Sequence, residues 1–239
     1  MSGPDGGARR DELAANLARV QARIAAAERA ADRAPGEVSL VVVTKFFPAS
    51  DVRLLAGLGV TDVGENRHQE AAAKAADCAD LDLAWHFIGG LQSNKAAAVA
   101  RYADVVESVD RARLVAPLAR GAAEEGRRVD VLLQVSLDPP DHTGERSGAT
   151  EADLGALAEA VSATESLRLR GLMAVAPLGE EPARAFERLA QIRQRFMQSF
   201  PEATTLSAGM SGDLEEAIAV GATHVRVGSA VLGSRPGVL

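Results

Sequence analysis

What this sequence lacks excludes several classes of protein. It has a single cysteine, Cys78, so no disulfide can form within the chain. It has no apolar run of the length that crosses a membrane. Its opening residues, MSGPDGGARRDE, lack the apolar core of a secretory signal. These absences favour a cytoplasmic location, where thiols stay reduced.

Excess positive charge is also missing. Lysine and arginine number 26 against 33 aspartates and glutamates, a net charge of −7, which disfavours a general nucleic-acid-binding surface. The four histidines show no metal-ligand spacing with the cysteine. We therefore expect no nucleic acid, no membrane and no metal among the partners.

What the sequence has is an alternation of strand-like and helix-like segments. An amphipathic helix is expected over residues 9–33, ended by Pro35-Gly36. Eight β-favouring runs follow, at 38–44, 61–64, 84–88, 103–106, 129–135, 168–174, 203–206 and 223–227. Helical segments separate them, at 50–57, 66–77, 94–101, 110–125, 151–163, 181–199 and 212–219.

This alternation predicts parallel strands joined by helical crossovers. Eight units indicate a closed (β/α)8 barrel of the TIM type, and a doubly wound open sheet is the alternative. The first strand is not followed by Gly-x-Gly-x-x-Gly, which favours the barrel. We expect residues 1–8 to be a disordered tail and residues 9–239 to form one barrel domain, with a mobile loop at 138–148.

Two cations are expected at the same end of the barrel. Lys45 ends the run VVVTK, and Arg226 lies in VRV of the last run. In a closed barrel the first and last strands are neighbours, and strand alternation points both side chains inward at the rim. Two cations there are costly unless an anion or an electron-rich ligand lies between them. A desolvated lysine there can attack a carbonyl and form a Schiff base.

Glycine-rich loops follow the seventh and eighth runs. They read SAGMSGD (207–213) and VRVGSAVLG (225–233), and such loops form the usual phosphate site of these barrels. Taken singly, a lysine at a strand end is more often solvated, and glycine loops are common turns. Together they indicate a ligand with an aldehyde and a phosphate, and pyridoxal 5′-phosphate meets both demands.

Several motifs resemble one known family. VTKFFP, VGEN, WHFIGGLQSNK, RGLMAV, LSAGMSGDLEEAI and VRVGSAVLG occur in that order across most of the chain. They are similar to those of the pyridoxal phosphate homeostasis proteins. The resemblance implies a fold-type III barrel like the N-terminal domain of alanine racemase. It also implies pyridoxal phosphate bound as an aldimine, a role in vitamin B6 and amino-acid homeostasis, and no established turnover.

The resemblance also implies roles for individual residues. Lys45 holds the aldehyde and Arg226 faces the pyridine nitrogen. The phosphate is contacted by Ser207, Gly209, Met210, Gly228 and Ser229. The ring pocket is lined by Asn66, His86 and Met173. One departure is Arg67, where the family commonly has an aromatic residue after GEN, and its consequence stays open.

The same residues bear on whether the protein is an enzyme. An arginine beside the pyridine nitrogen opposes ring protonation, so the cofactor is a weaker electron sink. A racemase also needs a second acid/base, which alanine racemase takes from a further C-terminal domain. Here few residues follow the last run, and the one tyrosine, Tyr102, precedes the fourth.

We therefore expect a non-catalytic carrier, a monomer or weak dimer whose partners are apo-enzymes and free amino acids. An amino-acid racemase or other weakly active Schiff-base enzyme is the alternative, and a purely regulatory module is a third possibility.

Overall fold

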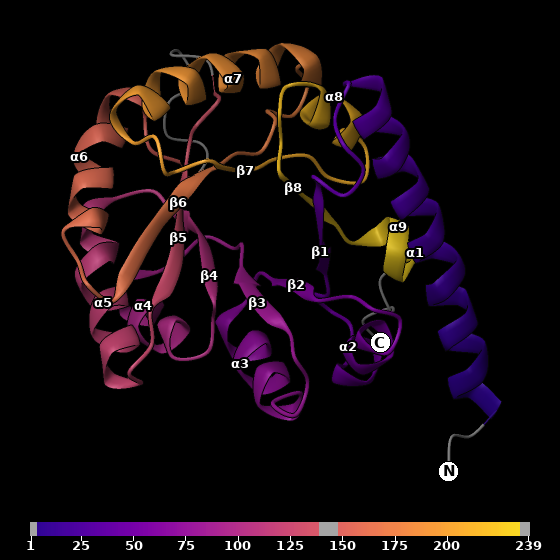
Figure 1. Ribbon diagram of the computed structural model, residues 1–239. Coiled ribbons are helices and arrows are strands. Elements are labelled where there is room, and N and C mark those ends of the chain that lie inside the picture. Colours follow the sequence, from indigo (N-terminus) through magenta and orange to yellow (C-terminus); the bar gives the residue numbers. More distant parts are fainter. Residues whose placement is uncertain (1–3, 139–147, 235–239) are drawn as a thin grey trace.

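The centre of the computed structural model, which describes residues 4–138 and 148–234, is a closed barrel of parallel strands (Figure 1). The strands are β1 (Ser39–Val43), β2 (Asp62–Glu65), β3 (Ala84–Phe87), β4 (Val105–Val109), β5 (Val129–Gln134), β6 (Leu167–Met173), β7 (Thr205–Ser207) and β8 (His224–Val227). Each strand pairs with the next, and β8 pairs with β1 from Ser39 opposite His224 to Val42 opposite Val227. This closure confirms the expected (β/α)8 barrel and excludes the open sheet.

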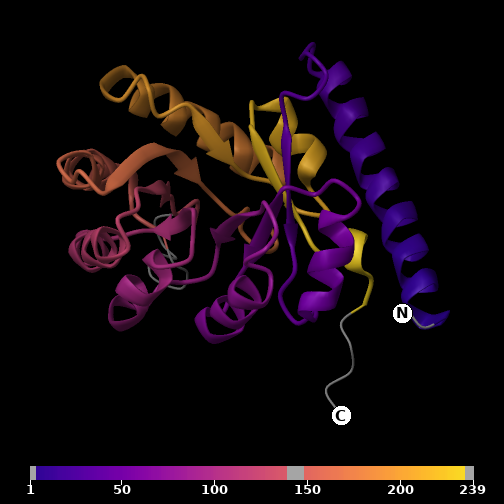
Figure 2. The ribbon, with the colours of Figure 1, turned by 60° about the horizontal axis from the view of Figure 1, so that its bottom comes forward.

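Helices surround the barrel and connect its strands (Figures 1 and 2). They are α2 (Ala49–Ala56), α3 (His68–Asp77), α4 (Ser93–Ala100), the 3₁₀ helix η1 (Ala112–Leu114), α5 (Val115–Glu124), α6 (Glu151–Ser162), α7 (Pro182–Ser199), α8 (Leu214–Ala219) and α9 (Ser229–Leu232). Within the described ranges, no helix combines the length and apolar character needed to cross a membrane.

The additional N-terminal helix, α1 (Pro4–Ala30), packs along the outside of the barrel against α8 and α9 (Figures 1 and 2). Its buried stripe repeats every three or four residues, as an amphipathic helix requires: Leu13, Leu17, Val20 and Ile24. The helix begins before the expected start at residue 9, so residues 4–8 are helical and not a tail. Proline tolerates the first helical position, since its missing N–H would have no partner there. Residues 1–3 lie outside the described chain.

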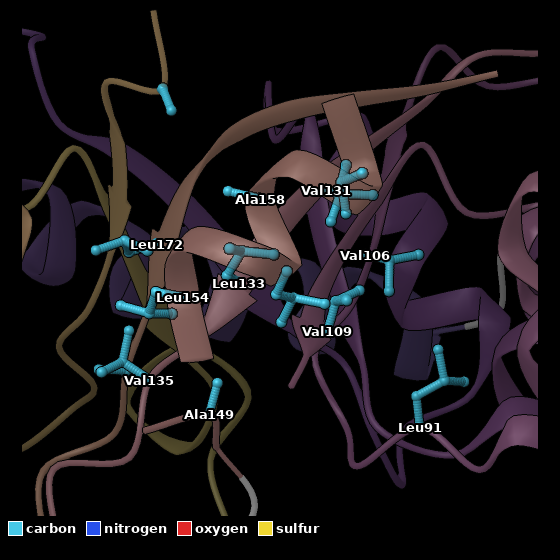
Figure 3. Close-up of a cluster of buried hydrophobic side chains, with 14 of the residues drawn as sticks. Leu91, Val106, Val109, Val131, Leu133, Val135, Ala149, Leu154, Ala158 and Leu172 are labelled. Carbon is cyan, nitrogen blue, oxygen red and sulfur yellow. The ribbon is translucent and has the colours of Figure 1, made fainter. Parts of the chain in front are cut away.

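Side chains alternate between the inside of the barrel and the layer beneath the helices. Figure 3 shows the outer layer, where Val131 and Leu133 of β5 lie near Leu154 and Ala158 of α6. The inner positions mix apolar with polar residues, and the buried polar ones include His86, Glu107, Ser207 and Arg226. This polar interior lies directly beneath the site described below.

One strand differs clearly from its expected position. β4 was expected at 103–106 but extends over Val105–Val109, with an irregular register to β5 between Val106 and Val109. The polar pair Glu107-Ser108 ended the predicted run, although both residues are fully or almost fully buried in the strand. The expected mobile loop at 138–148 lies largely outside the described residues.

Candidate functional site

A cavity of about 310 Å³ opens at the carboxyl ends of β1 and β8 and beside the loop after β7. It is lined by Val43, Lys45, Phe46, Phe47, Ile88, Met210, Ser211, Gly212, Arg226, Gly228, Ser229 and Gly233. The structure thus brings together five of the expected site residues: Lys45, Met210, Arg226, Gly228 and Ser229. Ser211 and Gly212 belong to the SAGMSGD motif but had no role assigned from the sequence.

The structure places Ser207 and His86 inside the barrel, not in the cavity lining. The Ser207 hydroxyl is fully buried and donates to Glu107 Oε2 at 2.6 Å, while it accepts from Arg226 Nη1 at 2.7 Å. His86 lies between two carboxylates, with Nδ1 2.7 Å from Glu107 Oε1 and Nε2 3.0 Å from Asp62 Oδ1. Neither residue is in the cavity lining, and their contacts with the phosphate and the ring stay predictions.

Three further expected residues also lie away from the lining. Gly209 is buried at φ +92°, where an added Cβ would lie 2.7 Å from Cβ of Ala217 in α8. Met173 is buried and lines a neighbouring cavity. Asn66 is exposed after β2, and its backbone approaches Gly89 so closely that a Cβ there would lie 2.1 Å from the Asn66 carbonyl oxygen.

Glu107 is the counter-ion of the site arginine, and sequence reasoning missed it. The Glu107 side chain is fully buried, and its Oε2 lies 3.7 Å from Nη1 of Arg226, which also donates through Nη2 to the Ala174 carbonyl oxygen at 2.9 Å. The premise that an anionic ligand must balance Lys45 and Arg226 is therefore wrong for Arg226. A carboxylate interrupting the apolar run VVESV was the one signal of this role.

The charges of this network reinforce one another. Burial disfavours a charged ring, but hydrogen bonds to Asp62 and Glu107 outweigh it and raise the pKa of His86 to about 9. Burial likewise disfavours the Glu107 carboxylate, but the hydrogen bond and charge of His86 and the charge of Arg226 lower its pKa to about 2. Burial lowers the pKa of Arg226, while the charges of Glu107 and Asp213 oppose this shift. These carboxylates therefore help to keep a positive guanidinium at the base of the cavity.

The loops after β7 and β8 form a tight wall of the cavity. A Cβ on Gly228 would lie 3.2 Å from the Val43 carbonyl oxygen, so a larger residue would press the loop away from β1. Ser229 begins α9, and the Met210 N–H donates to Asp213 Oδ1 at 2.6 Å, which holds the other loop. Small residues and hydroxyl groups at this wall suit a compact anionic group such as phosphate.

Lys45 lies in a turn held by charged groups from β2 and α3. Phe46, the next residue, has φ +73°, a conformation that side chains other than glycine rarely adopt. Its N–H donates to Glu70 Oε1 at 2.5 Å, and the Arg67 guanidinium lies 5.0 Å from the centre of its ring. Arg67 thus makes a cation–π contact with a neighbouring aromatic ring.

A second cavity, of about 480 Å³, adjoins the first and shares Ile88 and Met210 with it. Among the described residues, the exposed large hydrophobic side chains are Val175, Leu178 and Met210, and all three line this cavity. Three exposed apolar side chains therefore border the site on this side.

Comparisons with known proteins agree with this geometry. Over residues 10–236 the sequence matches the family described as "Alanine racemase, N-terminal domain". The pyridoxal phosphate homeostasis protein of Mycobacterium bovis is 43% identical over 243 residues, which cover 95% of this chain and 94% of that protein. The protein of the same name from Pseudomonas aeruginosa is 44% identical over 225 residues, which cover 93% and 96%.

A solved structure extends the likeness to three dimensions. PipY of Synechococcus elongatus, determined with PLP bound, is 38% identical and superposes with a TM-score of 0.79, covering 92% of this chain and 100% of that one. Sequence and fold agree, and the chain therefore belongs to the family of pyridoxal phosphate homeostasis proteins.

Proposed function

We propose that this protein binds pyridoxal 5′-phosphate covalently through Lys45 and holds it reversibly for vitamin B6 and amino-acid homeostasis in the cytoplasm. The observation that carries the proposal is the convergence of a lysine, a buried arginine and a serine-glycine wall on one cavity. The homologous PipY was solved with PLP bound.

The residues present fit this cofactor. The cofactor would supply an aldehyde carbon for a C=N bond to the lysine nitrogen, with the carbonyl oxygen and both amine protons lost as water. Lys45 supplies the amine at the end of β1. Arg226 offers a fixed positive charge that opposes protonation of a pyridine nitrogen beside it. Gly228 and Ser229, with Ser211 and Gly212, form the wall suited to the phosphate.

The lining also favours a carrier over an enzyme. Among the described residues that line the cavity, the ionisable side chains are Lys45 and Arg226 alone. Proton transfer to both faces of a substrate needs a second group that titrates near neutral pH, and arginine stays protonated. We therefore propose holding and release without robust turnover. Free amino acids and apo-enzymes would reach the cofactor across the rim of Val175, Leu178 and Met210.

Trapping tests the binding proposal. The sequence contains three lysines, Lys45, Lys74 and Lys95, so borohydride reduction of the loaded protein followed by peptide mass spectrometry gives an unambiguous answer. We expect the label on Lys45 and none in Lys45→Ala. Label on Lys74 or Lys95 in the wild type would refute the assignment.

A second assay tests the absence of turnover. The loaded protein is incubated with D- and L-amino acids in deuterated water, and exchange of the α-proton is followed by NMR. We expect negligible exchange over that of free pyridoxal phosphate. Fast, stereospecific exchange that disappears in Lys45→Ala would support the racemase alternative instead.

A further inference from the structure

The backbone on both sides of Lys45 is held by a buried cluster of charged residues. The Lys74 ammonium on α3 donates to the Thr44 carbonyl oxygen, Glu65 Oε1 and Glu70 Oε1, each at 2.7 Å. The Thr44 hydroxyl also donates to Glu65 Oε1, at 2.6 Å. Together with the bond from the Phe46 N–H to Glu70, the cluster therefore contacts the residue before Lys45 and the residue after it.

The charges of this cluster differ from those of an ordinary solvated ion pair, because burying them costs hydration free energy. The side chains of Lys74 and Glu65 are 7% and 1% exposed, so both ions have lost most of their hydration. All three ammonium donors have acceptors, which is the condition for keeping such a charge buried. Burial raises the pKa of Glu65, although the contacts with Lys74 and Thr44 oppose this.

The strained backbone shows what the cluster restrains. A phenylalanine at positive φ persists only where its surroundings hold it, and here the bond to Glu70 does so. With the Thr44 carbonyl and the Phe46 N–H both fixed, the direction of the Cα–Cβ bond of Lys45 between them is set. That direction places it in the lining of the cavity shared with Arg226 and Ser229.

We propose that Glu65, Lys74 and Glu70 form a positioning cluster that aims the Lys45 amine at the cofactor, a role distinct from docking α3 on the barrel. This inference rests on the proposed function, since it concerns the covalent step at the same cavity. It predicts that damage to the cluster slows covalent attachment while noncovalent binding of the phosphate and ring is retained.

The decisive variant is Glu70→Ala, which removes the acceptor of the Phe46 N–H and one partner of Lys74. Its matched control is Glu28→Ala. Glu28 is a carboxylate more deeply buried than Glu70, and it accepts from the N–H groups of Gly36 at 3.2 Å and Val38 at 2.8 Å, just before the other end of β1. Both variants lose two bonds around the same strand, but only Glu70 lies beside Lys45.

Two probes separate positioning from general damage. The rate of covalent attachment of pyridoxal 5′-phosphate is followed by absorbance, and equilibrium binding of pyridoxine 5′-phosphate, which lacks the aldehyde, by calorimetry. For Glu70→Ala we expect attachment to slow by about tenfold or more, the scale that misalignment of a reacting group produces, with the affinity for pyridoxine 5′-phosphate within about twofold of wild type. Glu70→Gln retains an acceptor oxygen and should recover much of the rate.

The outcomes are distinct. Attachment at the wild-type rate in Glu70→Ala, a parallel loss of pyridoxine 5′-phosphate binding, or equal slowing in Glu28→Ala would each overturn the positioning role. Lys74→Met gives a second test, because it leaves the two glutamates unbalanced and should slow attachment at temperatures where the variant is folded. A wild-type protein that binds pyridoxine 5′-phosphate but forms no covalent bond would overturn the proposed function itself.

Discussion

We expect the protein to lose stability as the pH rises from 6 to 9, because the buried His86 loses its proton over this range. Its ring lies inside the barrel between Asp62 and Glu107, and the pKa is raised from an ordinary value of 6.5 to about 9. A group whose pKa is higher in the folded protein binds its proton more tightly there than in the unfolded chain. Its contribution is therefore complete below pH 6.5 and is lost as the pH rises through 9.

The size of the effect follows from the two pKa values. Each pKa unit corresponds to about 1.36 kcal/mol, so the free energy of unfolding should fall by ~3 kcal/mol across this range. This loss is a large fraction of the free energy of unfolding of a typical domain, which is roughly 5–15 kcal/mol. Glu107 shows the opposite dependence. Its lowered pKa means that its contribution is present above pH 4.5 and is lost as the pH falls through about 2.

Urea denaturation at pH 6, 7.5 and 9 measures this loss. The chain has one tryptophan, Trp85, which is 6% exposed and adjacent to His86, so its fluorescence reports on unfolding of this part of the barrel. The control is His86→Gln, which does not titrate. Burial also raises the pKa of Cys78, but that thiol is present in both proteins and its contribution cancels in the difference. Equal losses in the two proteins, within about 0.5 kcal/mol, would refute the reasoning.

Three further predictions concern the fold and the site. Leu13→Ala opens a cavity under α1, where the side chain is fully buried, and should lower the free energy of unfolding by about 2–5 kcal/mol in urea denaturation; a loss below about 1 kcal/mol would show that α1 is not part of the core. Gly171→Ala should leave little folded protein by circular dichroism, because φ is +153° and the new Cβ would lie 1.8 Å from the Thr205 carbonyl oxygen; normal yield and melting temperature would contradict this. Lys45→Ala should abolish the covalent absorbance band while stability changes by less than about 1 kcal/mol, since the side chain is half-buried at the rim; a large loss of stability would assign Lys45 a structural role instead.

The architecture could be predicted because its signals are local. Each strand is a short β-favouring run and each helix a separate segment, so their number and order specify a closed barrel. The predicted element boundaries were wrong where the local sequence signal conflicts with the place of the residue in the fold. Residues 4–8 contain glycines that predict a tail, yet they begin α1. The pair Glu107-Ser108 looked like the end of a strand, yet both residues are buried and Glu107 is accepted by the polar interior of the barrel.

Strand alternation predicted the two cations of the site, and the glycine-rich loops and the family resemblance predicted Met210, Gly228 and Ser229. Lys45 and Arg226 occupy matching ends of neighbouring strands, so parity and closure place them together. Glu107 comes from β4, and no pattern in the sequence couples it to β8, because the contact crosses the inside of the barrel. The contacts expected for Ser207 and His86 came from the family resemblance, and a resemblance does not tell how deep in the barrel these side chains lie.

The positioning cluster shows a different limit. Glu70 and Lys74 are four residues apart on a helix, a spacing that in most sequences indicates a solvated ion pair of little energetic consequence. What makes this pair different is Glu65 from β2 and the Thr44 carbonyl, which meet it only when α3 packs against the ends of two strands. The residues that supply reactive atoms can be recognised in the sequence, because they are polar or charged residues within an apolar run. The residues that aim those atoms look ordinary until the fold buries them, and so they are found from the structure.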